Sequence, residues 1–271
     1  MIRFLILAGY FELTMYLQLS GKLNQYINLH YSYLAYISMF LSFVLALVQL
    51  IIWVKQMKIH SHLSGFWAKV ASIFLLCIPL FVGLFFPTVT LDSQTVSAKG
   101  YHFPVAAGSS KEIQQDEGTT TQYLKPDTSS YFTKSAYESE MKQAAKKYVD
   151  KKVIQVTTEN YMEVMEVIYD YPDQFAGKTI ELTGFVYNDP SNKNSQFLFR
   201  FGIIHCIADS GVYGLLTTGA PQHFENNTWI HAKGTLSIEY HKQLKQSLPV
   251  LHIIDCQTIT KPANPYVYRV F

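Results

Sequence analysis

Residues 34–54 read LAYISMFLSFVLALVQLIIWV, an apolar run without one charged side chain. A helix needs about 20 apolar residues to cross the hydrocarbon layer of a membrane, so this run is long enough to span it. Two further apolar stretches flank it, Phe4–Leu19 and Val70–Leu91. The sequence therefore predicts a membrane-anchored protein with about three transmembrane helices, near residues 4–19, 34–54 and 70–91.

The composition excludes several classes of protein. The chain has 271 residues and a formal net charge of +2, and it carries no basic stripe of the kind that binds phosphates. Nucleic acid is therefore not expected as a partner, whereas the lipid bilayer is. Three cysteines cannot all pair with one another, and Cys77 lies in the third apolar stretch, so no disulfide framework is predicted.

The short loop between the second and third stretches predicts the topology. It contains Lys55, Lys58 and Lys69 and no acidic residue, and short loops of this kind stay in the cytoplasm. We therefore expect a multi-pass protein of the cell membrane, with a cytoplasmic N-terminus and an extracytoplasmic C-terminal domain. The loop also holds His60 and His62, which could form a metal entry point but are more typical of residues near lipid headgroups.

Three polar side chains interrupt the predicted spans. Glu12 and Gln18 lie in the first span, and Gln49 lies in the second. A carboxylate in the bilayer is costly and usually faces a partner or a cavity. We predict that these residues contact a membrane partner, and two alternatives stay open for Glu12: a protonated or snorkelling side chain, and a proton relay.

The remaining residues predict a linker and a soluble domain. Asp92–Ser130 is rich in Ser, Thr, Gln and Gly, which favours a flexible spacer, and Lys134–Asp150 has the pattern of an exposed helix. Val153–Val156 is a candidate strand. The predicted organisation is a transmembrane domain over 1–91, a polar linker with a helix over 92–150, and a soluble domain over 151–271.

Period patterns indicate the fold of the soluble domain. Apolar residues recur at helical spacing from Tyr161 to Tyr169, with Thr158 as the expected N-cap and Pro172 as the stop. The period then changes to two, which predicts strands near Thr179–Tyr187, Gln196–Ala208, Tyr213–Thr218, Thr228–Glu239 and Val250–Thr260, with a turn at Asn188–Asn192. Central glycines at Gly184 and Gly234 are typical of bulges that curl a sheet. We expect an α+β domain with a small five-stranded OB-like β-barrel, preceded by helices.

Several short motifs resemble one known family. They are Ser20-Gly21, Gly184-Phe185-Val186-Tyr187, Arg200-Phe201 followed by Cys206-Ile207-Ala208-Asp209, and Pro262 with Pro265-Tyr266-Val267-Tyr268. The chain resembles the YcgQ-like family of Gram-positive membrane proteins, which are described as subunits of two-component permeases. The resemblance implies a multi-span membrane permease as partner and implies no known reaction. In the family pattern two adjacent cysteines precede the Ala-Asp step, whereas here His205 takes the first position, so a vicinal dithiol is absent.

The strongest candidate for a metal site lies around that motif. Zinc is bound by Cys, His and carboxylate side chains, and the candidate ligands are His205, Cys206, Asp209, His252 and Cys256. We expect His252 and Cys256 to share one face of the last strand, and we place His231 on the outward face of the strand before it. Two alternatives stay open, a Cys206–Cys256 disulfide and cysteines that serve as small core residues, of which the second is favoured.

The chain lacks the sequence signatures of common enzymes. Asp209, Ser210 and His205 resemble a triad only in composition, because residues of a single turn cannot easily supply the required geometry. The aromatic C-terminus, with Tyr266, Tyr268 and Phe271, is expected to fold back over the domain, and a docking strip is the alternative.

Three functions fit these features. The leading one is a non-catalytic accessory subunit of a membrane permease, whose barrel shapes access of the solute or binds it. The second is a stand-alone extracytoplasmic module that binds a glycan on exposed rings such as Phe197, Phe199 or Tyr213. The third is a metal-handling protein with zinc on the barrel, which is compatible with the first.

Overall fold

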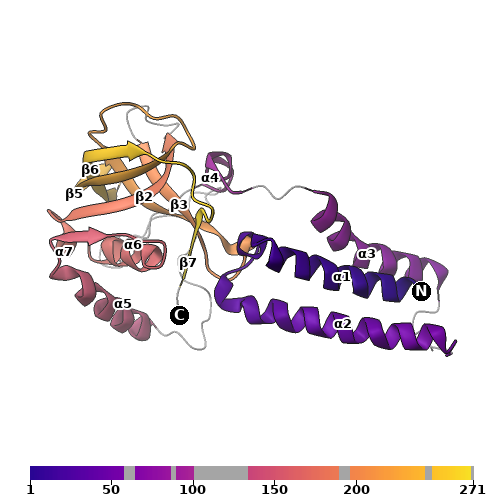
Figure 1. Ribbon diagram of the computed structural model, residues 1–271. Coiled ribbons are helices and arrows are strands. Elements are labelled where there is room, and N and C mark those ends of the chain that lie inside the picture. The colour runs from indigo at the N-terminus through magenta and orange to yellow at the C-terminus, as the bar shows by residue number, and fades with distance from the viewer. Residues whose placement is uncertain (58–64, 87–89, 101–133, 189–195, 242–245, 270–271) are drawn as a thin grey trace. The chain divides into compact units, whose positions relative to one another are not determined.

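The computed structural model describes residues 1–57, 65–86, 90–100, 134–188, 196–241 and 246–269. The chain forms two compact units, Met1–Thr90 and Leu91–Phe271, each with its own packing (Figure 1). The first unit is helical, and the second is built on a mixed β-sheet.

The first unit contains three long helices, α1 (Ile2–Leu19), α2 (Ser32–Val54) and α3 (Phe66–Phe85). Each is long and apolar enough to cross a membrane, and α1 is the least apolar of the three. Two 3-10 helices, η1 (Lys22–Gln25) and η2 (Leu29–Tyr31), connect α1 to α2. The predicted number and approximate positions of the spans are therefore confirmed as helices.

The bounds predicted for the third span are wrong at both ends. Helix α3 begins at Phe66, before the expected start at Val70, and it ends at Phe85 rather than continuing to Leu91. Phe86 is extended, with φ −93° and ψ 132°, and proline follows it in the sequence. A residue before proline avoids the helical region, which explains the stop.

Two glycines bring α1 and α3 close together. A Cβ added to Gly9 would lie 3.0 Å from Leu80, and a Cβ added to Gly83 would lie 2.9 Å from Leu13. Small residues at such crossings are typical of helices that pack within membranes. Because the residue numbers rise together in both pairs, α1 and α3 run parallel.

The second unit begins at Leu91 and therefore includes the start of the segment predicted as a flexible spacer. Helix α4 (Ser93–Lys99) is ordered by its contacts with the sheet unit, because the Val96 side chain is only 1% exposed. The Ser93 amide donates to the Asn227 side chain at 2.8 Å. The start of the segment predicted as a flexible spacer is therefore part of the fold, and residues 101–133 lie outside the described residues.

Helix α5 (Lys134–Val149) is present as predicted but is not an exposed helix. Met141, Ala144, Ala145 and Tyr148 are all buried. Their spacing of three, four and seven places them on one face of a helix, and this face packs on α6. The charged residues of α5 occupy its other faces, which is why its composition alone resembles that of an isolated helix.

Helix α6 (Tyr161–Asp170) confirms the second predicted helix, and the short α7 (Pro172–Phe175) begins at the expected stop. The predicted N-cap is wrong, because Asn160 precedes the first helical turn and Thr158 has another role. The Thr158 hydroxyl accepts a hydrogen bond from Arg200 at 3.0 Å. In Figure 1, α6 lies between α5 and the strands.

The strands largely follow the period-two pattern. They are β1 (Val153–Gln155), β2 (Thr179–Asn188), β3 (Gln196–Ile203), β4 (Gly211–Thr218), β5 (Trp229–His241), β6 (Gln246–Thr258) and β7 (Tyr266–Tyr268). The predicted second long strand is too long, because the chain leaves β3 at Ile203 and forms a 3-10 turn, η3 (Ile207–Asp209). Most of the predicted turn after β2 lies outside the described residues.

Five long strands pair in a circuit. The sheet order is β1-β2-β5-β6-β4-β3-β7, and β2 also pairs with β3, so β2, β5, β6, β4 and β3 each have two neighbours within the circuit. The contact between β4 and β6 is parallel, and the other four contacts of the circuit are antiparallel. The short strands β1 and β7 add in parallel to β2 and β3. The C-terminal segment therefore folds back over the unit, as predicted.

Glycines allow two close backbone approaches in this circuit. A Cβ on Gly234 would lie 2.3 Å from the His252 carbonyl oxygen, and the register between β5 and β6 shifts between Lys233 and Gly234. The bulge predicted at Gly234 is thereby confirmed. A Cβ on Gly214 of β4 would lie 1.9 Å from the Leu198 carbonyl oxygen of β3.

The second unit has two cores. The interior cluster combines α5 and α6 with one face of the strands, and its fully buried members include Tyr161, Ile168, Ile180, Leu198 and Leu215. The aromatic cluster lies on the other face of β2 and β3 and contains Phe185, Tyr187, Phe197, Phe199, Phe201, Trp229 and Tyr266, together with Val96 of α4. Strand β3 is therefore buried on both faces.

Two tyrosines of α6 bind the backbone of β4. Strand β4 pairs with β6 only from Leu216 to Thr218. Beyond that pairing, the Tyr161 hydroxyl donates to the Tyr213 carbonyl at 3.3 Å, and the Tyr169 hydroxyl donates to the Gly214 carbonyl at 2.5 Å. The helix thus replaces the strand pairing that β4 lacks there.

Candidate functional site

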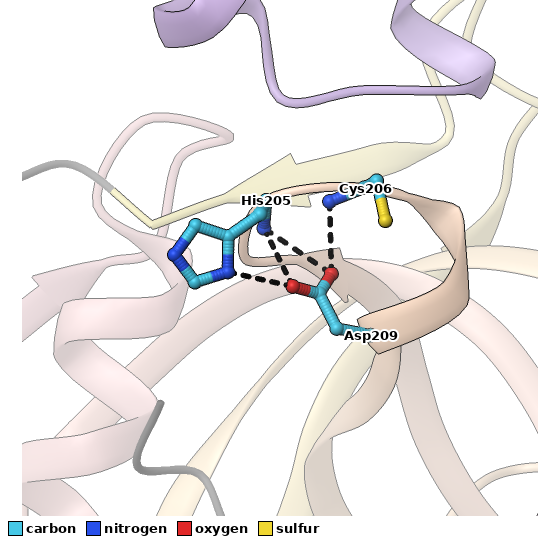
Figure 2. Close-up of polar contacts among 3 residues, drawn as sticks. All are labelled: His205, Cys206 and Asp209. Atoms are coloured by element: carbon cyan, nitrogen blue, oxygen red, sulfur yellow. Dashed lines mark hydrogen bonds and ion pairs between the residues drawn. The ribbon is translucent and has the colours of Figure 1, made fainter. Parts of the chain in front are cut away.

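The turn between β3 and β4 contains three of the five predicted metal ligands. The Asp209 carboxylate accepts hydrogen bonds from the backbone amide of His205 at 3.0 Å and from that of Cys206 at 2.9 Å. The same carboxylate contacts Nδ1 of the His205 ring at 2.7 Å (Figure 2). Asp209 therefore closes the turn by binding both of its first residues.

The side chains of this turn do not converge. Figure 2 shows the His205 ring and the Cys206 sulfur on opposite sides of the Asp209 carboxylate. The neighbouring Ser210 is 1% exposed, and its hydroxyl accepts from the Lys99 ammonium at 3.1 Å. His205, Asp209 and Ser210 are thus adjacent without forming the nucleophile–base arrangement of a catalytic triad.

The two candidates on β6 point to different faces of the strand. His252 is exposed, and its ring nitrogens contact Thr218 at 2.9 Å and Glu239 at 2.6 Å. Cys256 packs against the interior cluster. The prediction that these two residues share a face is wrong, because Ile254 has no partner where the register shifts, and this extra residue reverses the alternation.

The environment of Cys256 disfavours its thiolate form. Burial raises the pKa of the Cys256 thiol, and the neighbouring Asp255 carboxylate raises it further. A thiol must lose its proton to bind a metal, so both effects oppose metal binding at this position. All three cysteines of the chain are free thiols in this structure.

No group of three or more His, Cys, Asp and Glu side chains within the described ranges is arranged to hold a metal ion. The five predicted ligands lie in two places, the β3–β4 turn and strand β6. The zinc hypothesis therefore stays a prediction. His231, on β5, contacts the Thr183 hydroxyl at 3.0 Å. His60 and His62, between α2 and α3 in the sequence, lie outside the described residues.

The rings proposed as a glycan platform lie inside the unit. Phe197 and Phe199 are fully buried in the aromatic cluster, where their rings stack 5.1 Å apart, and Tyr213 is 5% exposed. The prediction that these rings are exposed is wrong. Phe197 and Phe199 pack with residues of α4 and β7, both distant in sequence, and Tyr213 belongs to the interior cluster.

Sequence reasoning missed a buried arginine. Arg200 is 3% exposed, and its guanidinium donates to the backbone carbonyls of Asn264, Pro265 and Tyr266 at 3.0 to 3.2 Å. Burial lowers its pKa. The signal that marks this residue in the sequence is its place between two phenylalanines in an apolar strand. Arg200 fastens the C-terminal segment to β3.

Sequence reasoning also missed a buried ion pair. Glu166 of α6 lies 3.5 Å from Arg269, and their side chains are 4% and 10% exposed. Burial raises the pKa of Glu166 to about 7, and the Arg269 charge opposes this shift. Its Oε1 atom has no hydrogen-bond partner among the described residues. The sequence signal is a single carboxylate amid Val164, Met165, Val167 and Ile168.

The polar residues of the spans differ in exposure. Glu12 of α1 is exposed on the surface of the first unit, whereas Gln18 and Gln49 are half-buried. Contact of these three residues with a membrane partner stays a prediction.

Three apolar helices joined to a strand-rich unit define a membrane-anchored protein. The chain belongs to the DUF1980 family: the model of the DUF1980 N-terminal domain matches residues 2–102, and that of the DUF1980 C-terminal domain matches residues 131–269. It is 68% identical to the "Putative two-component membrane permease complex subunit" of Streptococcus mutans serotype c, over the full length of both chains. It is 40% identical to "UPF0703 protein YcgQ" of Bacillus subtilis, again over both full lengths. The resemblance to the YcgQ-like family is thereby confirmed.

Proposed function

We propose that this chain is a non-catalytic accessory subunit of a membrane permease complex. The observation that carries the proposal is the sparse burial of the spans. In the most apolar stretch of each span, only 6% (first), 11% (second) and 0% (third) of the residues are buried within the chain. Three spans that bury so little of one another cannot enclose a transport path of their own. The S. mutans relative is described as a subunit of a two-component complex, which supports a second membrane protein as partner.

The second unit is proposed to be an OB-type barrel that shapes access of the solute or binds it. The circuit of five strands supports this assignment, since an OB fold is a small five-stranded barrel. The bulge at Gly234 also supports it, because bulges bend strands around a barrel. The proposal places no reaction on this unit.

The barrel is proposed to lie outside the cytoplasm. Arg3 stands at the start of α1, and Lys55 and Lys69 flank the loop between α2 and α3. Lysine and arginine accumulate on the cytoplasmic side, so the N-terminus and this loop would be inside and the second unit outside. Protease added to intact cells should then degrade a tag at the C-terminus and spare one at the N-terminus. The reverse pattern would overturn the topology.

The test of the function is purification of the tagged full-length protein from its native membrane in mild detergent. We expect a multi-span membrane protein in near-equal amount. Purification of the chain alone, from membranes in which its abundance is unchanged, would contradict the proposal. A stand-alone module that binds a glycan or a metal would then be the remaining hypothesis, although the rings proposed for glycan binding are buried.

A further inference from the structure

Two faces of α1 are occupied by its neighbours in the first unit. Towards α3, the Tyr10 hydroxyl donates to the Leu76 carbonyl at 2.9 Å, next to the close approach at Gly9. Towards α2, the rings of Phe11 and Phe43 lie 5.3 Å apart. The two neighbours leave a third face of α1 uncovered.

That third face is a stripe formed by Leu5, Glu12, Tyr16 and Leu19. All four side chains are exposed. At 100° per residue they fall within a sector about 60° wide, and the residues that contact α2 and α3 lie outside this sector, with Gly9 next to one edge of it. We call this surface the α1 stripe. Gln18 and Gln49 are half-buried and do not belong to it.

Glu12 places a carboxylate at mid-depth on this stripe. At 1.5 Å per residue it lies about 15 Å from the start of α1, or half of a hydrocarbon layer about 30 Å thick. No hydrogen bond or ion pair joins it to another part of the chain that the structure describes. Ionisable residues at this depth rarely face lipid, because burial without a partner is costly.

The chain itself offers no cation at that depth. The described spans contain two cations, Arg3 in α1 and Lys69 in α3, and α2 contains none. Because α1 and α3 run parallel, with Gly9 beside Leu80 and Leu13 beside Gly83, Lys69 lies beyond the level of Arg3 on the side away from Glu12. Arg3 is about 14 Å along the axis from Glu12, and Lys69 is farther from it. A second copy with the same topology would hold its cations at the same levels, so it could not pair with Glu12 either.

We propose that the α1 stripe docks a membrane-spanning helix of a different protein, and that Glu12 pairs with a lysine, arginine or histidine of that helix. The inference rests on the proposed permease complex and names the contact that joins its two components. Leu5 and Leu19 supply apolar contacts on either side of the pair. Tyr16 accepts a hydrogen bond from Lys22 at 3.0 Å, which fixes its ring at one end of the stripe.

The test compares tagged full-length variants purified in mild detergent. Glu12→Leu should lower the ratio of the multi-span partner to this chain by about tenfold or more, and Glu12→Asp should retain most of it. The matched control is Ser38→Leu, which also replaces an exposed polar residue of a span but lies on α2. It should leave the ratio unchanged. Equal amounts of each variant in the membrane fraction establish that insertion is intact.

Three results would overturn the inference. If Glu12→Leu retains the partner at the wild-type ratio, the carboxylate faces lipid or serves another role, and the proposed function still stands. If the wild-type protein purifies only with further copies of itself, the α1 stripe does not dock a helix of a different protein. If the wild-type protein purifies alone, both the inference and the proposed function fail. This result differs from the first one, in which the wild-type protein still purifies with its partner.

Discussion

The two units of this chain differ in how far they bury their apolar side chains. In the second unit every apolar residue of α6 is buried, and Tyr161, Val164, Met165 and Ile168 have no exposed surface. In the first unit, α3 has no buried residue, and Phe66, Trp67 and Phe85 are each at least 71% exposed. The sheet unit therefore carries its own core, whereas the helices leave most of their apolar side chains exposed to a surrounding membrane and, under the proposed function, to a partner. This difference predicts where a substitution unfolds the chain and where it changes only a contact.

The largest effect is expected from Gly214→Val, which tests whether the second unit depends on its own packing. A Cβ at this position would lie 1.9 Å from the Leu198 carbonyl, so β3 and β4 must separate. We expect destabilisation of more than about 5 kcal/mol, measured as loss of protease resistance of the unit in membranes. Ala263→Val, at an exposed position, is the control. Equal resistance of both variants would show that the close approach is not required.

A smaller effect is expected from Arg200→Met, which tests how firmly the C-terminal segment belongs to the core. Three carbonyls, two of them in buried hydrogen bonds, would lose their donor, at a cost of about 4 kcal/mol in the free energy of unfolding. Lys233→Met is the control, since its partner Glu181 is partly exposed and the pair contributes under about 1 kcal/mol. Urea unfolding followed by fluorescence measures both. Similar urea midpoints for the two variants would contradict the role of Arg200 in fastening the C-terminal segment to β3.

The pH dependence of the second unit should reveal Glu166. Its pKa rises from 4.5 in the unfolded chain to about 7 in the folded unit. The stability that this group contributes is therefore complete below pH 4.5 and is lost as the pH rises towards 7 and beyond, by about 3 kcal/mol. Glu166→Gln should remove that loss. Urea unfolding at pH 5 and pH 8 measures it, and the same decline in both proteins would refute the assignment.

The smallest effect is expected in the first unit, from Gly83→Leu. The larger side chain should separate α3 from Leu13 of α1, at a cost of about 1 kcal/mol in helix association. Labelling of Cys77 in detergent should become faster in a chain whose other two cysteines are serine. Val82→Leu, on an exposed position, is the control. The unfolding of the second unit should not change, and a shift there would break the contrast between the units.

The sequence predicts most of the elements but not their long-range packing. The three spans follow from uninterrupted apolar runs, and the five long strands follow from alternation, because both signals are local. The burial of α5 and of the outer face of β3 is not local. The buried face of α5 packs on α6, the next helix, and the outer face of β3 is covered by α4 and β7, which are distant in the chain.

The candidate site is the part that sequence patterns predicted least well. His205, Cys206 and Asp209 are adjacent in the chain, and the structure shows them in one turn, but their side chains diverge. His252 and Cys256 should share a face in a regular strand, and one unpaired residue, Ile254, separates them. The bulge reverses the alternation, but the unpaired residue is itself apolar, so the sequence Ile253-Ile254 does not show where the alternation changes. Arg200 and Glu166 were visible as charges in apolar runs, and their partners were not.

The hydroxyls of Tyr161 and Tyr169 affect how the sheet edge at β4 can interact with other protein copies in the same membrane. Strand β4 would otherwise present open carbonyls beyond its short pairing with β6, and an open strand edge is a template on which another chain can add. Neighbouring copies held in one plane meet far more often than molecules in solution. We expect the two tyrosine hydroxyls, by occupying these carbonyls, to disfavour aggregation through this edge of the sheet.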